Sequence, residues 1–331
     1  MNTFGTFLRT SIIGESHGNG VGVILDGVPA GVPLKFIDFA EDLGRRRAGA
    51  KGTTPRREAD LPKLHTGVFN DHTTGAPLTI LFENTNTRSK DYDKLREMPR
   101  PGHADFVASK KFGGFEDYRG GGHFSARLTT GLVAAGVVAK KIIYPVSLEA
   151  KLVEAGGNPD IDAAIDKAME EQDSIGGIIE CRATGMPIGL GEPFFDSLES
   201  LLAHMMFSIP AVKGIEFGSG FRAAKMKGSE HNDNILSMDG KTETNHAGGI
   251  NGGISNGNPL VFRIAIKPTS SISLEQKTLN VKSGKVESLK VEGRHDLCVA
   301  LRAPVIVEAA TALVLGDLMM LAGMVDRVSG S

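Results

Sequence analysis

The sequence predicts an α+β fold built around buried helices, and three observations support it. Short apolar runs such as residues 4–13 and 20–28 are separated by polar or glycine-rich turns, which is typical of strands. Two longer apolar segments, residues 126–143 and 303–325, have the length and composition of buried helices. No proline- or serine-rich linker divides the 331 residues. We therefore expect one domain over residues 1–331, with strands packed around shared helices.

The individual elements follow in chain order from their periodicity. Strands are expected at residues 4–13 (FGTFLRTSII) and 20–28 (GVGVILDGV), and again within 61–69, 76–84 and 212–272. Helices are expected at residues 36–47, 126–143, 159–174, 194–207 and 303–325. The helix at 36–47 ends in the basic run RRR, the charge that a helix dipole favours at its carboxyl end. The helix at 159–174 should begin near Asn158 or Asp160, because both side chains are good caps.

The segment 303–325 (APVIVEAATALVLGDLMMLAGMV) is apolar enough to resemble a membrane span. Glu308, Thr311 and Asp317 lie inside it, and its flanks carry no asymmetry of cationic residues. We therefore expect a helix covered by sheet on several sides, and no association with a membrane.

Composition excludes several classes of function. The formal net charge is -2 with a pI of about 6.5, so no global basic field indicates binding to nucleic acid or to a membrane. The two cysteines, Cys181 and Cys298, form no CxxC pair, which excludes a disulfide framework and a cysteine-based zinc site. Few cysteines and an N-terminus without a signal-peptide pattern favour the cytoplasm.

The stretch DYRGGGHFSAR, residues 117–127, precedes the apolar helix expected at 126–143. Consecutive glycines allow a ligand to approach the backbone closely. A helix start adds unpaired N–H groups and a partial positive charge. The stretch therefore favours an anionic ligand, although glycine-rich loops before core helices are also common.

Histidines stand in three glycine- or proline-framed turns. His17 lies in GESHG, which fits the nucleophile elbow of α/β-hydrolases, but the following glycines break the helix that the elbow needs. His103 lies in RPGHAD, and Asp296 closes GRHD at 293–296. No H-x-H or H-E-x-x-H pattern occurs, so we expect acid–base chemistry and no metal site.

Six cations in residues 45–57 (RRRAGAKGTTPRR) indicate binding of an anion. A nucleic-acid patch is the alternative, but no aromatic residue for base stacking lies between Ala40 and Val68. A small polyanionic metabolite fits the arginine forks better. The loops at 245–255 and 267–271 add backbone-rich polar turns that suit a nucleotide or a flavin mononucleotide. The chain has no Walker A motif and no Rossmann fingerprint.

Taken together, these loops resemble the chorismate synthase family. The matching pieces occur in order along nearly the whole chain, which makes the resemblance far more specific than any single motif. They are GESHG at 14–18, RRRAG at 45–49, TTPRRE at 53–58, TGVFNDHTTGAP at 66–77, RSKDY at 88–92, RPGHADF at 100–106, DYRGGGHFSAR at 117–127, AVKGIEFG at 211–218, NHAGGINGGISNG at 245–257, KPTSSI at 267–272 and GRHD at 293–296. Residues 144–200 match least.

The resemblance implies a cytoplasmic lyase of the shikimate pathway, which serves aromatic amino-acid biosynthesis. It would convert 5-enolpyruvylshikimate 3-phosphate to chorismate and phosphate by a 1,4-anti elimination. The family needs reduced FMN, and NADPH is a candidate reductant. Because no inserted reductase domain is visible, an external reductant is favoured. The resemblance further implies a homotetramer, and a single large domain in which buried helices are sandwiched between antiparallel β-sheets.

The resemblance also implies roles for individual residues. His17 would protonate the departing phosphate, His103 would govern the protonation state of the flavin, and Asp296 would assist removal of the C6 hydrogen. Substrate binding carries over to Ser16, Arg46, Lys51 and Arg127. FMN binding carries over to His123, Phe124, Ser125, Pro210, Ala211, Gly252, Lys267, Pro268, Thr269, Ser270, Ser271 and Arg294.

Two departures from the family pattern stand out. Many members have Arg-Ser-Ser where this chain has His123-Phe124-Ser125, so Phe124 packs on the flavin ring or into the core instead. The basic loop is about one residue shorter, and Lys51 replaces an arginine near Gly52.

Two other functions use the same loops. An FMN-dependent oxidoreductase or flavin reductase is the alternative enzyme, although it has no need of the arginine cluster. An FMN- or nucleotide-binding module is the alternative outside catalysis, and His17, His103 and Asp296 would then be dispensable.

Overall fold

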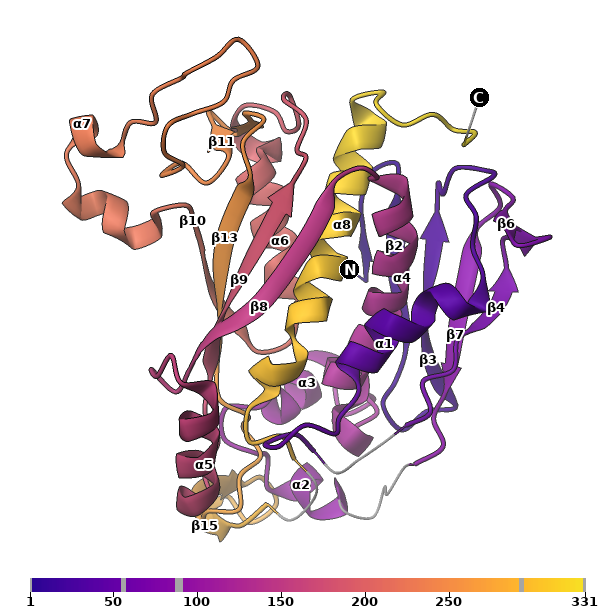
Figure 1. The fold of residues 1–331 in the computed structure, drawn as a ribbon. Coiled ribbons are helices and arrows are strands. Elements are labelled where there is room, and N and C mark those ends of the chain that lie inside the picture. The colour runs from indigo at the N-terminus through magenta and orange to yellow at the C-terminus, as the bar shows by residue number, and fades with distance from the viewer. Residues whose placement is uncertain (1, 55–57, 87–91, 292–294, 330–331) are drawn as a thin grey trace.

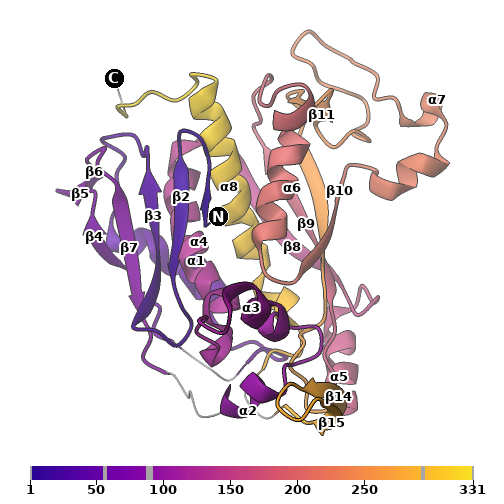
Figure 2. The same ribbon diagram turned by 180° about the vertical axis from the view of Figure 1, so that it is seen from behind.

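The computed structural model describes residues 2–54, 58–86, 92–291 and 295–329. Two antiparallel sheets flank a layer of helices (Figure 1). Strands follow the order β1-β2-β3-β7-β4 in the first sheet and β10-β13-β9-β8 in the second. The view from behind shows α6 beside α8, between the two sheets (Figure 2). The α+β fold with helices sandwiched between antiparallel sheets is therefore confirmed.

The strands are short, and their bounds are as follows. The first sheet contains β1 (Thr3–Phe4), β2 (Arg9–Gly14), β3 (Gly20–Asp26), β4 (Lys63–Thr66) and β7 (Leu78–Glu83). The second contains β8 (Ser147–Ala155), β9 (Gly177–Thr184), β10 (Val212–Phe217) and β13 (Leu260–Ile266). Three hairpins pair β5 (Val68–Phe69) with β6 (His72–Thr73), β11 (Ile250–Asn251) with β12 (Ile254–Ser255), and β14 (Gln276–Asn280) with β15 (Lys285–Leu289).

The helices form the middle layer and the ends of the sandwich. The α-helices are α1 (Ala40–Arg46), α2 (Asp93–Glu97), α3 (Asp105–Phe112), α4 (Thr129–Ile142), α5 (Ile161–Glu171), α6 (Leu198–Ser208), α7 (Gly228–His231) and α8 (Pro304–Leu321). Short 3-10 turns are η1 (Phe36–Phe39), η3 (Arg119–Phe124), η4 (Ala126–Leu128), η5 (Phe194–Asp196), η6 (Gly220–Lys225) and η7 (Val299–Arg302). The predicted cap is confirmed, because the Asp160 carboxylate accepts the Ala163 N–H at 3.0 Å and begins α5.

Two strands of the second sheet were not among the sequence predictions. β9 lies between β13 and β8, so it is central to that sheet. β8 alternates charged and small residues (SLEAKLVEA), a composition that suits an exposed helix as well as an edge strand. Its strand structure comes from pairing with β9, for example Ala150 opposite Cys181, which a local pattern does not reveal.

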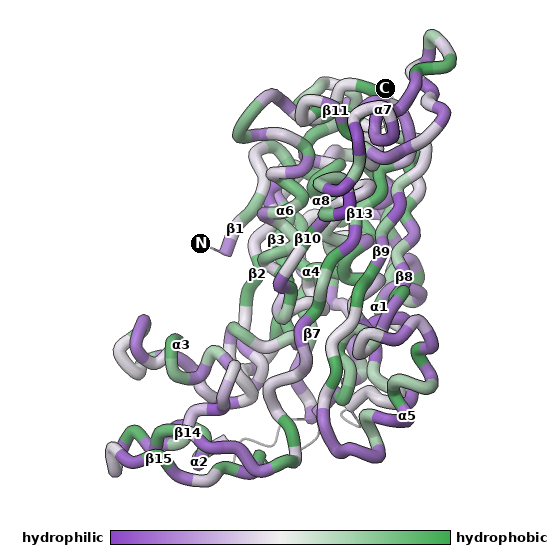
Figure 3. The backbone as a smooth tube through the Cα atoms, turned by 90° about the vertical axis from the view of Figure 1, so that its left-hand side faces the viewer, coloured by the Kyte–Doolittle hydropathy of each residue, from purple (hydrophilic) through white to green (hydrophobic). Residues whose placement is uncertain are grey.

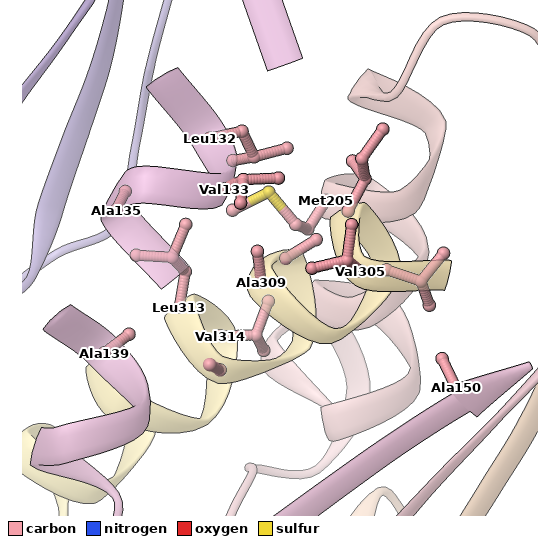
Figure 4. Packing of buried hydrophobic residues seen from close by; sticks show 14 of the residues in the cluster. Leu132, Val133, Ala135, Ala139, Ala150, Met205, Val305, Ala309, Leu313 and Val314 are labelled. Carbon is pink, nitrogen blue, oxygen red and sulfur yellow. The ribbon is translucent and has the colours of Figure 1, made fainter. Parts of the chain in front are cut away.

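The core lies where α4 and α8 pack side by side. A Cβ added at Gly136 of α4 would lie 2.2 Å from the Ala309 Cβ of α8, so glycine is required for this close approach. Val133, Leu313 and Met205 of α6 pack around the crossing (Figure 4). The hydrophobic colouring is concentrated along these helices and the inner strands (Figure 3).

Helix α8 is long and apolar enough to cross a membrane, but 89% of its 18 residues are buried inside the protein. This agrees with the expectation of a core helix. Its Glu308 carboxylate lies 2.6 Å from the Arg45 guanidinium and 2.8 Å from the Lys140 ammonium. Burial alone would raise the pKa of Glu308, but the bonds to Arg45 and Lys140 outweigh it and hold the pKa below its usual value.

Asp317, the second carboxylate of α8, holds the bend between β1 and β2. It accepts the backbone N–H groups of Thr6, Phe7 and Leu8 at 2.9, 2.7 and 2.8 Å. Charged acceptors of this kind contribute more than neutral ones.

The Asp317→Asn variant should lose about 2 kcal/mol of unfolding free energy, because an amide N–H₂ replaces one acceptor oxygen opposite these donors. Urea titration measures this loss. The control is Glu171→Gln, whose exposed carboxylate lies 3.8 Å from Lys167 and should contribute less than about 0.5 kcal/mol. Equal midpoints for the two variants would contradict the assignment of the bend to Asp317.

Candidate active site

A cavity of about 780 Å³ opens at the end of the sandwich, near α3. Its wall is formed by segments that are distant in the sequence. They lie within 46–54, 58–60, 100–104, 120–127, 207–213, 267–271 and 295–302. Among the described residues, seven lysine and arginine side chains and three carboxylates line the cavity, and this excess of positive charge favours an anionic ligand. The cations are Arg46, Arg47, Arg100, Arg127, Lys213, Lys267 and Arg302, and the carboxylates are Glu58, Asp60 and Asp296.

The three consecutive glycines lie directly over the GESHG turn. Gly120, Gly121 and Gly122 all have positive φ angles, of 60°, 79° and 52°. A Cβ added at Gly120 would lie 2.4 Å from Cδ2 of His17 and 2.9 Å from Oγ of Ser16. Glycine is therefore needed here for backbone conformation and for the close approach to the imidazole.

The GESHG turn is tied to this loop by two further bonds. The Ser16 N–H donates to the Gly122 carbonyl at 3.0 Å, and the His123 Nδ1–H donates to the Gly14 carbonyl at 2.8 Å. His17 is only 7% exposed, and its ring meets the Tyr92 ring edge-on at 5.1 Å. The Ser16 Oγ is buried and has no hydrogen-bond partner within the described part of the chain.

His103 is held by a carboxylate and a guanidinium. Its Nδ1 lies 2.6 Å from Oδ1 of Asp105 and 3.0 Å from Nη2 of Arg100. Arg100 also donates to Asp105 at 2.8 Å and to the Ser271 Oγ at 3.0 Å. Because the Asp105 carboxylate engages Nδ1, the Nε2 atom of His103 is the one left for the cavity.

Asp105 should make stability fall in acid. Burial would raise the pKa of Asp105, but the hydrogen bonds from Arg100 and His103 outweigh it and place the pKa well below its ordinary 3.8. A depressed folded-state pKa stabilises the protein above the unfolded value, and this contribution is lost as the pH falls from about 4 towards the folded pKa. Wild-type midpoints in urea should therefore fall more steeply below about pH 4 than those of Asp105→Asn. Parallel curves would contradict this role.

Asp296 and Asp60 form the anionic centres of the opposite wall. Asp296 accepts the Thr54 N–H at 2.8 Å and lies 3.2 Å from Nη1 of Arg302. Asp60 lies between two guanidinium groups, 3.5 Å from Arg46 and in direct contact with Arg127. Burial, reinforced by the nearby Arg302 charge, lowers the pKa of Arg46 to about 9, so this guanidinium stays charged at neutral pH.

Residues 8–320 match the family model described as chorismate synthase. The chain belongs to the chorismate synthase family. It is 66% identical to the chorismate synthase of Chitinophaga pinensis over 329 residues, covering 99% of both chains. It is 45% identical to that of Dehalococcoides mccartyi, again covering 99% of both. A solved structure titled "Crystal Structure of Chorismate Synthase" superposes with a TM-score of 0.73 at 26% identity, covering 96% of this chain and 93% of that one.

Membership of the chorismate synthase family makes the chain an enzyme, a carbon–oxygen lyase. Most residues predicted for its site lie at one place. Those that line the cavity are His103, Asp296, Arg46, Arg127, His123, Phe124, Ser125, Pro210, Ala211, Lys267, Pro268, Thr269, Ser270 and Ser271. His17 and Ser16 lie immediately behind Gly120, which also lines the cavity.

Two further predicted residues, both described by the structure, do not line the cavity. Lys51 is 53% exposed and pairs with Asp166 of α5, so its charge is directed away from the cavity. Gly252 lies in the turn between β11 and β12, outside the set of lining residues. Arg294 lies outside the described residues.

The loop at 267–271 has the chemistry that a bound flavin phosphate would need in a chorismate synthase. The Lys267 ammonium donates to the Ser270 Oγ at 2.7 Å, and burial followed by the charge of Lys213 lowers its pKa. The Thr269 Oγ1 is buried with no partner in the part of the chain described. Phe124, 6.2 Å from the Phe112 ring, adds an apolar surface to the same cavity. The residues present therefore fit FMN.

Sequence reasoning missed Asp60, Asn84 and Arg302. Asp60 has a left-handed φ of 48°, which is uncommon outside glycine and asparagine. No local sequence pattern predicts this conformation. Asn84 and Arg302 matter through partners distant in the sequence, namely Arg127 and Asp296. Only Arg302 had a usable signal, because it ends a short turn before the apolar helix α8.

Proposed function

We propose that this chain converts 5-enolpyruvylshikimate 3-phosphate to chorismate and phosphate by a 1,4-anti elimination. The observation that carries the proposal is one strongly cationic cavity with His103 and Asp296 in its wall and His17 directly behind Gly120 of that wall. The substrate carries a phosphate and two carboxylates. Paired guanidinium groups such as Arg46 and Arg127 match these anions in charge and geometry.

The acid–base groups have separate positions around the cavity. His17, enclosed under Gly120 beside Tyr92, would donate a proton to the departing phosphate. His103, fixed by Asp105, would exchange a proton through Nε2. Asp296, oriented by Thr54 and Arg302, would assist removal of the C6 hydrogen.

Reduced FMN, when bound, supplies the electron-rich centre at N5 that the C6 hydrogen removal needs. In this chain the residues that would hold it are His123 to Ser125 and Lys267 to Ser271, all of which line the cavity. Bound flavin and substrate would displace water from the cavity and so shield the reacting groups from it.

Chorismate formation from purified protein, substrate and chemically reduced FMN under nitrogen tests this function. We expect equal amounts of chorismate and phosphate with reduced FMN, and neither with oxidised FMN. An arm with NADPH and oxidised FMN asks whether the protein reduces its own flavin, and we expect no product there. Absence of turnover with a folded protein that binds FMN would overturn the proposal and favour a flavin reductase.

We further propose that residues 1–331 act as one catalytic domain, in the cytoplasm and as a homotetramer. The single domain is supported by a main hydrophobic core that draws residues from both sheets. The cytoplasmic location is supported by two buried free cysteines. The homotetramer is supported by four large apolar side chains in the part of the sequence that connects β9 to β13. They are almost fully exposed in the single chain, as residues of a subunit interface would be. They are Phe194, Phe195, Phe221 and Met238.

Light scattering after gel filtration should give four times the 35.0 kDa of one chain. The tetramer of the double variant Phe221→Ser with Met238→Ser should dissociate, because two apolar side chains of the proposed interface become polar. Phe115→Ser is the control, since Phe115 is 94% exposed but lies elsewhere, just after α3. A monomeric wild type would contradict the assembly.

A further inference from the structure

We propose that Asn84 is a positioning residue that sets the His17 turn and Arg127 in register with each other. This inference rests on the proposed function, because it concerns the group assigned to protonate the phosphate and a group assigned to bind substrate. Asn84 directly follows β7, at the edge where the GESHG turn and the start of α4 approach the same sheet.

The Asn84 amide bonds to both of these segments at once. Its Nδ2 donates to the carbonyl of Glu15 at 3.0 Å and to the carbonyl of Gly18 at 2.9 Å. Its Oδ1 accepts from Nε of Arg127 at 3.1 Å. Both amide hydrogens and the amide oxygen are therefore engaged, and the two accepting carbonyls lie on either side of His17 in the turn.

The contact continues from Arg127 into the cationic wall. Arg127 pairs with Asp60, which also faces Arg46 across 3.5 Å. The neighbouring Glu83 carbonyl accepts a second bond from Arg127, at 3.3 Å. A shift of the Asn84 amide would thus move His17 relative to the groups that anchor the anionic substrate.

The chemistry of this position is specific to an amide. Aspartate would keep an acceptor for Arg127 but would place a carboxylate oxygen against the carbonyls of Glu15 and Gly18. Alanine would remove both sets of bonds. The two variants therefore separate the link to the His17 turn from the link to Arg127.

Steady-state kinetics of Asn84→Asp and Asn84→Ala test the proposal in the full-length protein. Misplacing a catalytic group by about 1 Å costs on the order of 100-fold in rate, so kcat should fall by about that factor in both variants. KM for the phosphorylated substrate should stay within about threefold of wild type in Asn84→Asp and rise clearly in Asn84→Ala, because only the former keeps the Arg127 bond.

A second measurement needs no ligand and reports the position of the His17 imidazole directly. In histidine-labelled protein, the imidazole resonances of His17 should shift in the neutral Asn84→Ala variant. The matched control is Asn258→Asp, whose amide makes comparable bonds to the Gly240 carbonyl at 2.9 Å and the Thr242 N–H at 3.1 Å but does not line the proposed active site. That control should lose stability yet keep wild-type kcat and His17 resonances.

Unchanged kcat and unchanged His17 resonances in both Asn84 variants would overturn the proposal and leave Asn84 a structural role. If Asn84→Asp fails to fold, Asn84→Gln, which keeps both polar groups displaced by one methylene, replaces it with the same expected fall in kcat. If wild-type protein forms no chorismate, the proposed function fails, and the His17 resonances still decide the positioning role.

Discussion

Replacing Gly120 with alanine is expected to slow chorismate formation severely while the protein stays folded. The added Cβ would lie 2.4 Å from Cδ2 and 2.6 Å from Nε2 of His17, distances that real Cβ atoms do not show. Either the imidazole or the glycine loop must move, and general acid catalysis contributes about 10²- to 10⁴-fold. We expect kcat to fall by at least about 100-fold, as measured by chorismate formation under nitrogen.

Gly114→Ala is the matched control for backbone strain. Gly114 also has a positive φ, of 82°, but a Cβ there would meet nothing within 4 Å. Both variants should lose about 1 to 2 kcal/mol of stability from the left-handed conformation, and only Gly120→Ala should lose turnover. Full activity in Gly120→Ala would contradict the role of His17 as the general acid.

Asp60→Asn is expected to cause the largest loss of stability among the cavity variants, about 3 to 5 kcal/mol. Asp60 is 5% exposed, and its carboxylate is the partner that Arg46 and Arg127 share. A neutral amide would leave two buried guanidinium groups facing each other with no compensating charge. Urea unfolding at pH 7 measures the effect.

Asp26→Asn provides the comparison, because Asp26 pairs with Arg9 on the surface at 2.5 Å with both side chains largely exposed. Its loss should stay below about 1 kcal/mol. Equal losses of unfolding free energy for the two variants would mean that Asp60, Arg46 and Arg127 are solvated like a surface pair. This would contradict their place in the buried cavity wall.

The buried helices could be predicted from sequence because each carries its own pattern. Helix α8 combines an apolar run with Glu308 and Asp317, and these charges are satisfied by Arg45, Lys140 and the backbone at residues 6–8. β8 and β9 could not be predicted in the same way. Their structure depends on pairing across the sheet, where context overrides local preference.

The parts of the site that lie in tight turns could be predicted, because glycine and proline mark such turns in the sequence. Glycines at 120–122 and the prolines and glycines around His103 announce tight turns. Asp60 and Asn84 act through Arg46, Arg127 and the GESHG turn, all distant in the chain, so no spacing reveals them. Lys51 was predicted to bind substrate because it lies in a basic run. Its charge is instead paired with Asp166 of α5, a partner that the basic run itself does not reveal.

A crystal structure of the protein with oxidised FMN and 5-enolpyruvylshikimate 3-phosphate tests the central claim most directly. We predict that both molecules occupy the cavity between the Gly120–Ser125 loop and the 267–271 loop, with the substrate phosphate nearest His17. Both ligands in a different cavity, such as the one lined by Arg182, Arg222 and His246, would contradict it.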